Sequence, residues 1–130
     1  MAARALDTEL VDVLDSSPTA HVATLLPDGA PHSVPVWTGT HEGHVVIMTG
    51  PCSQKARNLR RDPRVAISLT PTDNPSYPVV LRGRVVTWLT GEEGWAVVDA
   101  IAEKYIHAPY DRSRERVVAM IAVDHYRMGM

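Results

Sequence analysis

The sequence is poor in three features that assign many proteins to a class: cysteine, net charge and long apolar runs. Its one cysteine, Cys52, excludes an internal disulfide framework. A formal net charge of −2 is unlike that of a protein whose whole surface binds nucleic acid. No stretch approaches the roughly 20 apolar residues of a membrane-spanning helix, and the first residues lack the apolar region of a signal peptide. We therefore expect a single cytoplasmic domain, residues 1–130, that binds neither nucleic acid nor membranes.

The sequence also lacks the patterns that carry hydrolytic or metal chemistry. It has no Ser-His-Asp order, no paired carboxylates and no Walker-type glycine loop. His41 and His44 are close together in a predicted hairpin, but no third ligand is nearby. The sequence thus predicts no catalytic side chain and no metal site, and we interpret Cys52 as a small residue in a turn.

The pattern of apolar residues predicts a mainly β fold with peripheral helices. Apolar residues make up 45 % of the chain, as in an ordinary globular protein. Helical spacing and helix-start signals predict three helices, over residues 4–16, 53–61 and 91–106. Short apolar or alternating runs predict about six strands, over residues 19–26, 31–38, 45–49, 65–69, 79–89 and 117–123. Strands linked by turns such as Asp28-Gly29 indicate an antiparallel sheet or barrel.

Three of the predicted strands have unusual features. Pro35 cannot donate a ladder hydrogen bond, so the strand over residues 31–38 should have an edge or a bulge there. Residues 79–89 and 117–123 carry apolar side chains on both faces, and a small barrel has only one interior. The outer face must be covered either by a helix or by a second subunit, and a homodimer is the expectation that we test.

A run of basic residues follows the third predicted strand. Its members, opposed only by Asp62, lie within ten residues: Lys55, Arg57, Arg60, Arg61 and Arg64. Ser53 is a suitable helix N-cap, and the start of a helix favours an anion. A basic first turn is unfavourable unless an anion neutralises it. The run therefore fits either a solvated helix face or a phosphate-binding site.

Residues 48–67 resemble the signature of the pyridoxamine-phosphate-oxidase-like, flavin-binding split-barrel superfamily. Ser53-Gln54-Lys55, Leu59 and Asp62-Pro63 match this signature in order and spacing. The segment from Lys55 to Arg64 is most similar to the actinobacterial branch that binds the deazaflavin cofactor F420. The resemblance covers nearly the whole chain and implies a split β-barrel whose homodimer holds the cofactor in the groove between subunits.

The resemblance also implies roles for individual residues. Contacts to the cofactor phosphate or its phosphate-linked tail are implied for Ser53, Lys55, Arg57 and Asn58. An approach to the ring system is implied for Met48 and Thr49. The substrate side is implied to be lined by His32, Val34 and Trp37. Trp37 is the best candidate to stack on a ring, whereas His32 fits a packing role as well as a catalytic one.

The function that follows from the resemblance is an F420-dependent oxidoreductase that transfers a hydride to or from a small organic substrate. Val34-Pro35-Val36-Trp37 stands where many FMN-binding relatives carry basic residues, which favours F420 over FMN. The alternatives are an FMN-binding oxidoreductase of the same fold and a non-catalytic carrier of the cofactor. Because the cofactor performs the hydride transfer, no acid–base side chain is required.

Overall fold

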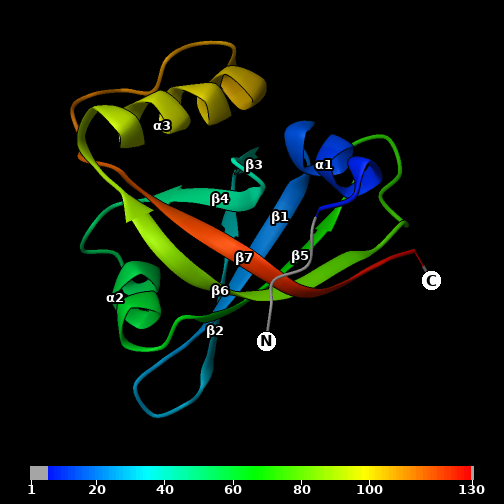
Figure 1. Ribbon diagram of the computed structural model, residues 1–130, viewed down its shortest axis with the longest axis horizontal. Coiled ribbons are helices and arrows are strands. Elements are labelled where there is room, and N and C mark those ends of the chain that lie inside the picture. Colours follow the sequence, from blue (N-terminus) through cyan, green and yellow to red (C-terminus); the bar gives the residue numbers. More distant parts are fainter. Residues whose placement is uncertain (1–5, 130) are drawn as a thin grey trace.

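Seven strands and three helices make up residues 6–129, the part of the chain that the computed structural model describes (Figure 1). The helices are α1 (Thr8–Asp15), α2 (Gln54–Arg61) and α3 (Gly91–Ile106). The strands are β1 (Thr19–Leu25), β2 (Pro31–Val36), β3 (Thr38–His41), β4 (His44–Thr49), β5 (Arg64–Thr70), β6 (Val79–Leu89) and β7 (Val117–Met128). The helix predicted from residue 4 begins at Thr8, and residues 4 and 5 lie outside the described part.

The strands form one antiparallel sheet that curls into a half-barrel, in the order β2-β1-β5-β6-β7-β4-β3. The mainly β split-barrel fold expected from the sequence is confirmed. The two edge strands, β2 and β3, follow each other in the chain with only Trp37 between them. The chain therefore passes from one edge of the sheet to the other at this residue.

That passage corrects one prediction. A single strand over residues 31–38 is wrong, because β2 pairs with β1 and β3 pairs with β4. The apolar run Val34-Pro35-Val36-Trp37 continues without a break past the end of β2, so the local pattern carries no sign of the change of partner. The expected edge at Pro35 is confirmed, since β2 is an edge strand of the sheet.

The last strand is longer than the apolar run that predicted it. Residues 124–128 of β7 continue its pairing with β6, from Arg82 opposite His125 to Val79 opposite Met128. Their polar side chains ended the predicted strand at residue 123. Gly83 allows the close approach of β6 and β7 at a bulge, because a Cβ there would lie 2.0 Å from the carbonyl oxygen of Ala122.

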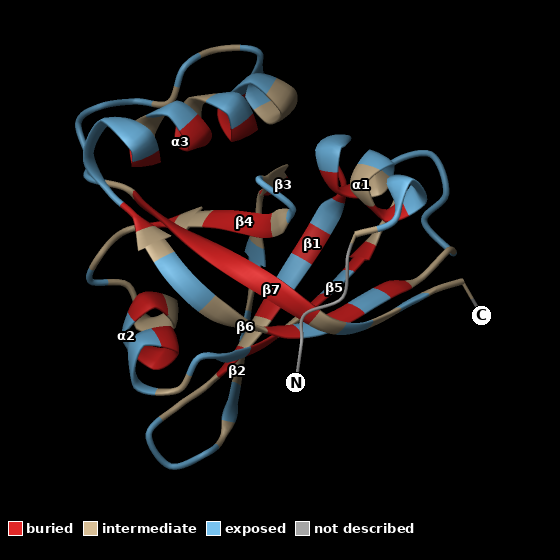
Figure 2. Cartoon of the chain, viewed as in Figure 1, coloured by how far each residue is buried: buried red, intermediate tan, exposed pale blue. Residues whose placement is uncertain are grey.

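Buried residues of the sheet form the core inside the half-barrel, and two helices close it. The buried residues are coloured red in Figure 2. Leu10 and Leu14 of α1 are fully buried in this core, and Leu59 of α2 reaches the same core. Ile47 and Ile121 belong to the sheet's share of the core. The closing helix α2 is thereby fixed at the end of β4, where the candidate site begins.

The third helix covers part of the outer face of the sheet. Val98 and Ile101 of α3 pack on Val46, Val118 and Met120. Helix cover is thus the reason that the run over residues 117–123 is apolar on both faces. On β6, Val80 and Val86 remain 46 % and 47 % exposed. No helix within residues 6–129 combines the length and the apolar character needed to cross a membrane.

Candidate functional site: a cleft at the start of the second helix

A cleft of about 950 Å³ opens where four chain segments meet. It is lined by residues 17–20 at the start of β1, 35–37 at the end of β2, 48–53 and 55 from β4 into α2, and by Tyr105, Tyr110 and residues 114–116 near the end of α3 and before β7. A volume of this size is at the upper end of the range of small-molecule sites. The cleft can therefore hold a cofactor of flavin size.

The turn that leads into α2 is fixed by short hydrogen bonds. The Ser53 backbone N–H donates to the carbonyl of Gly50 at 3.1 Å, which closes the turn. The Ser53 side chain caps the helix, because its hydroxyl accepts from the backbone N–H of Ala56 at 3.1 Å. The hydroxyls of Thr49 and Ser53 lie 2.7 Å apart. The predicted N-cap is confirmed, and both hydroxyl-bearing residues line the cleft.

Lys55 is the cation of α2 that faces the cleft. Its side chain is half-buried, and both this burial and the nearby charge of Arg116 lower the pKa of its ammonium. Among the described residues, no hydrogen bond or ion pair to Lys55 is found. A desolvated cation in the first turn of a helix is unfavourable by itself, and an anion in the cleft would offset both costs.

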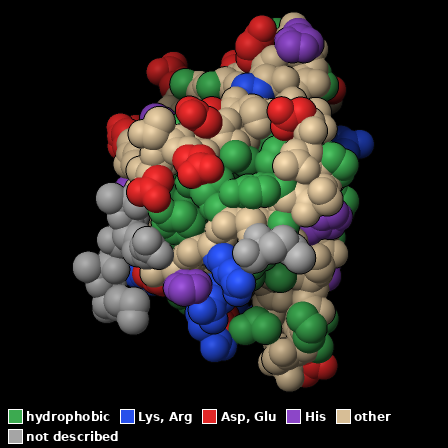
Figure 3. Space-filling model, turned by 90° about the vertical axis from the view of Figure 1, so that its right-hand side faces the viewer, with side chains coloured by type: hydrophobic (Ala, Val, Ile, Leu, Met, Phe, Trp, Pro, Cys, Tyr) green, Lys and Arg blue, Asp and Glu red, His purple; other side chains and the backbone are tan. Residues whose placement is uncertain are grey.

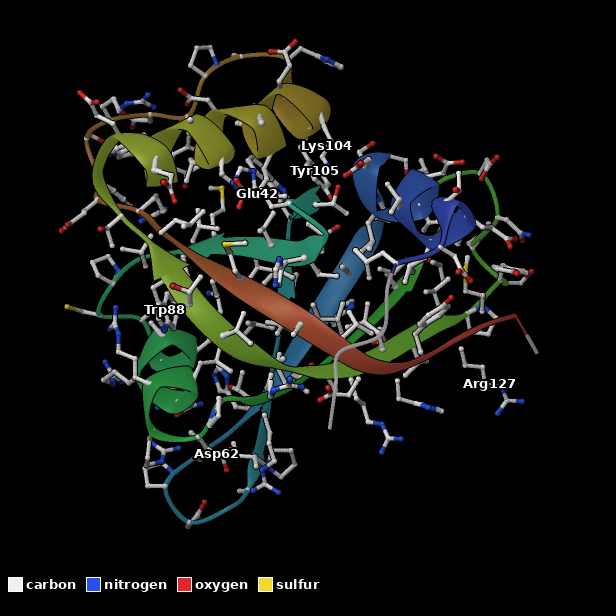
Figure 4. All side chains as sticks on the ribbon, viewed as in Figure 1. Glu42, Asp62, Trp88, Lys104, Tyr105 and Arg127 are labelled. Atoms are coloured by element: carbon white, nitrogen blue, oxygen red, sulfur yellow. The ribbon has the colours of Figure 1, made fainter. Side chains whose placement is uncertain are left out.

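The other basic residues of the run point elsewhere. Arg57 donates to the carbonyl of Cys52 at 2.7 Å, and Arg60 donates to the carbonyl of Pro51 at 2.5 Å. Arg61 donates to the carbonyl of Leu25, and Arg64 forms an ion pair with Asp62 at 2.7 Å. The guanidinium of Arg60 also lies over the ring of Trp88, 4.8 Å from its centre, beside α2 (Figure 4). Two of these arginines tie α2 to the turn before it and a third ties it to the end of β1, and none of the four lines the cleft.

Asn58, a predicted cofactor contact, is fully buried on the side of α2 that faces β1. Its Nδ2 donates to the hydroxyl of Thr24 on β1 at 3.0 Å, and its Oδ1 accepts from Gln54 at 2.8 Å. The structure therefore brings Met48, Thr49, Ser53 and Lys55 together at the cleft, but not Arg57 or Asn58.

On the predicted substrate side, only Trp37 lines the cleft among the three residues named from the sequence. Val34 packs against the core of the half-barrel. His32 lies opposite Thr24 in the register of β1 and β2, and its Nδ1 is buried without a hydrogen-bond partner in the described structure. Pro35 and Val36 line the cleft beside Trp37 and make this wall apolar.

Two tyrosines that sequence reasoning missed complete an aromatic wall. The ring of Tyr105 stacks on Trp37, with centres 5.1 Å apart and planes inclined by 5°. Tyr110 meets Trp37 edge to face at 6.0 Å. The Tyr105 hydroxyl is fixed by the carbonyl of Pro18 at 3.0 Å and the N–H of Thr38 at 3.2 Å (Figure 4). Tyr105 falls in the helix predicted over residues 91–106, and the sequence gives no signal that the end of this helix borders a cleft.

Arg116 is the third functional residue that the sequence analysis missed. It precedes β7, and because Thr49 pairs with Val117, Arg116 lies beside Gly50 at the end of β4. Only knowledge of this strand pairing would have placed it at the cleft.

The cleft suits a ligand that combines an anion with a planar ring. Its lining includes the cations Lys55, Arg114 and Arg116 and, among the described residues, a single carboxylate, Glu115. The described part of the chain has no group of three His, Cys, Asp or Glu side chains that could hold a metal ion.

Comparisons with solved structures agree with this fold. The solved structure titled "F420 Reductase" superposes with a TM-score of 0.76 and 24 % identity, covering 89 % of this chain and 94 % of that one. The conserved hypothetical protein Rv2991 from Mycobacterium tuberculosis gives a TM-score of 0.78 with 29 % identity, covering 98 % and 86 %. The FAD and heme binding protein from Mycobacterium smegmatis gives a TM-score of 0.72 with 19 % identity, covering 100 % and 73 %. These structures share the fold.

No curated protein matches the sequence. In contrast, residues 6–128 match the protein family described as pyridoxamine 5'-phosphate oxidase. Since this match spans almost the whole chain, the chain belongs to the pyridoxamine 5'-phosphate oxidase family.

Proposed function

We propose that the chain binds the deazaflavin cofactor F420 in the cleft at Lys55 and acts with it as an oxidoreductase. The observation that carries the proposal is a half-buried lysine without a counter-ion in the described structure, at one end of a cleft whose other wall is aromatic and apolar. A phosphate at the lysine and a ring system along the apolar wall are the two parts of a flavin-type cofactor.

The proposal divides the cleft residues by role. Ser53 and Lys55 bind the phosphate or the phosphate-linked tail, and Met48, Thr49 and Trp37 face the ring system and the substrate. Arg57 and Asn58 do not contact the ligand in this proposal, and their hydrogen bonds hold the turn and the helix in the fold. When bound, F420 supplies hydride transfer at its central ring, and the side chains of this protein bind and orient it.

FMN is the second candidate for the same cleft. The wall formed by Pro35, Val36 and Trp37 offers no cation that would add to Lys55 from β2, which favours F420. The structural neighbour named an F420 reductase supports the same choice, whereas the neighbour named an FAD and heme binding protein keeps flavins in consideration.

A non-catalytic carrier of the cofactor would use the same binding residues. The two functions differ in turnover, so the protein should be incubated with reduced F420 and a panel of candidate acceptors. Oxidation of F420 that depends on both protein and acceptor supports the oxidoreductase, and tight binding without turnover supports the carrier.

We also propose that the protein is a homodimer whose second subunit completes the groove. Its cytoplasmic location stays a prediction of the sequence. The exposed Val80 and Val86 of β6 support a second subunit. Hydrophobic side chains also gather between acidic and basic ones on the face that carries α1 (Figure 3). Light scattering after size exclusion at micromolar concentration tests the dimer, and a monomer contradicts it.

Equilibrium titration by fluorescence, with F420 and with FMN, tests the proposed cofactor. F420 should bind more tightly than FMN. Tenfold tighter binding of FMN would make FMN the cofactor, and binding of neither would overturn the proposed function.

A further inference from the structure

Arg116 has a position in the cleft that the proposed function does not use. The pairing of Thr49 with Val117 puts it across from the turn that leads into α2. A Cβ on Gly50 would lie 3.4 Å from its Nη1, so the guanidinium rests directly against the glycine. Arg116 and Lys55 therefore line the same cleft, one from just before β7 and one from α2, and they are close enough for the charge of Arg116 to lower the pKa of Lys55.

The guanidinium of Arg116 is held by neutral groups. Its Nε and Nη2 donate to the hydroxyl of Tyr110 at 3.3 and 3.0 Å, and its Nη1 donates to the carbonyl of Glu115 at 2.9 Å. Its central carbon lies 5.1 Å from the centre of the Tyr110 ring. No carboxylate within residues 6–129 forms an ion pair with it. Since a guanidinium has five N–H donors, some remain for a ligand.

Tyr110 is itself fastened to α3. Its backbone N–H donates to Asp99 at 3.0 Å, and Arg112 donates to both oxygens of the same carboxylate at 2.8 and 2.7 Å. The guanidinium of Arg112 lies 4.0 Å from the centre of the Trp95 ring. These bonds to Arg112 and Tyr110 lower the pKa of Asp99 to about 2, so the carboxylate stays charged at any ordinary pH. The loop before β7 is thus anchored at Tyr110, the residue whose hydroxyl positions Arg116.

Two positive side chains that face one cleft repel each other, and the charge of Arg116 contributes to the lowered pKa of Lys55. A phosphoryl group removes this repulsion, because it accepts from the planar fork of an arginine and from a lysine at the same time.

We propose that Arg116 is a second anion-binding residue of the cleft, and that Arg116 and Lys55 together select ligands that carry a phosphoryl group. Tyr110 is the positioning residue that aims the guanidinium of Arg116. This inference rests on the proposed function only in assuming that the phosphate is attached to a ring system; phosphate binding by Arg116 and Lys55 does not depend on it.

Paired ligands with and without phosphate test this role. FMN is compared with riboflavin, and F420 with its deazaflavin chromophore without the phosphate-linked tail. The variant is Arg116→Gln. Its matched control is Arg127→Gln, which removes the same charge from the exposed far end of β7, away from α2 (Figure 4).

The Arg116→Gln variant should bind the phosphorylated ligand about ten- to a hundredfold more weakly, as expected for a lost charge-assisted hydrogen bond. Its affinity for riboflavin or the chromophore should stay within about twofold of the original protein. The Tyr110→Phe variant should lose about two- to tenfold, for the phosphorylated ligand alone. An equal loss for both members of a ligand pair, or a loss no larger than that of Arg127→Gln, would overturn the inference.

Inorganic phosphate separates this inference from the proposed function. If the original protein binds neither flavin nor deazaflavin, the proposed function fails while the phosphate site is still tested. Phosphate, at constant ionic strength, should then raise the melting temperature of the original protein and of Arg127→Gln more than that of Arg116→Gln. Equal shifts in all three proteins would overturn the phosphate site.

Discussion

Replacing Lys55 by methionine should weaken cofactor binding without destabilising the fold, because the charge of Lys55 does not stabilise the protein in the absence of cofactor. Methionine keeps the length and the apolar stem of the side chain while removing the ammonium. In the structure that ammonium is half-buried and repelled by Arg116, which is why its pKa is lowered. The melting temperature of the empty variant should therefore equal or exceed that of the original protein.

The same substitution should weaken cofactor binding. A hydrogen bond between an ammonium and a phosphate contributes about 1.5–3 kcal/mol, or roughly ten- to a hundredfold in dissociation constant. The loss should shrink as salt is added, since part of it is screened Coulomb attraction. Binding by the original protein should also weaken as the pH rises through the lowered pKa of Lys55, because only the protonated amine attracts the phosphate.

Arg57→Met is the control within the same helix. Arg57 carries the same charge two residues away, but it bonds the carbonyl of Cys52 instead of lining the cleft. Fluorescence titration with F420 or FMN measures both variants, and calorimetry measures the empty proteins. Equal losses of affinity for Arg57→Met and Lys55→Met would refute the reasoning. So would a loss of several degrees in the melting temperature of empty Lys55→Met.

Two further substitutions test the frame of the site. Asn58→Ala removes the donor to the buried hydroxyl of Thr24 and should cost about 1–3 kcal/mol in urea unfolding, while the affinity of the folded protein for cofactor changes little. Lys104 donates to the carbonyls of Leu14 and Thr38, and burial lowers its pKa from 10.5 to about 8. Between these pH values Lys104 binds a proton more readily in the unfolded chain than in the folded protein. The free energy of unfolding of the original protein should therefore rise, relative to that of Lys104→Met, as the pH rises from about 8. Urea unfolding at each pH measures this difference. Unchanged stability of Asn58→Ala, or a falling difference for Lys104→Met, would contradict these assignments.

Local signals made part of the fold predictable. The second helix was predicted because Ser53 caps its start and Asp62-Pro63 ends it, and both signals act within one turn of the chain. The strand over residues 79–89 was predicted because it is rich in β-branched residues, which stand in two groups, Val79-Val80 and Val85-Val86-Thr87. Local signals do not predict which strands pair with each other. The division of the chain at Trp37 follows from such pairing, because β2 before it pairs with β1 and β3 after it pairs with β4.

The candidate site was half predictable for the same reason. Ser53 and Lys55 belong to one contiguous motif, so the sequence displays them together. Arg116 stands 61 residues after Lys55 and reaches the cleft only through the pairing of β4 with β7. The aromatic wall likewise depends on how the end of α3 meets Trp37, which is a matter of tertiary packing.

The basic run itself combines a binding residue with scaffold, and the carbonyls around it explain why. The turn before α2 leaves the carbonyls of Pro51 and Cys52 without strand or helix partners, and Arg60 and Arg57 donate to them from the helix. The two arginines hold the carbonyl oxygens of Pro51 and Cys52 toward α2. The side chains of Ser53 and Lys55, at the start of α2, line the cleft. A run of like charge is therefore tolerable here because most of its members are bound to backbone oxygens. Lys55, the one member without a partner in the described structure, is the one that we propose binds the ligand.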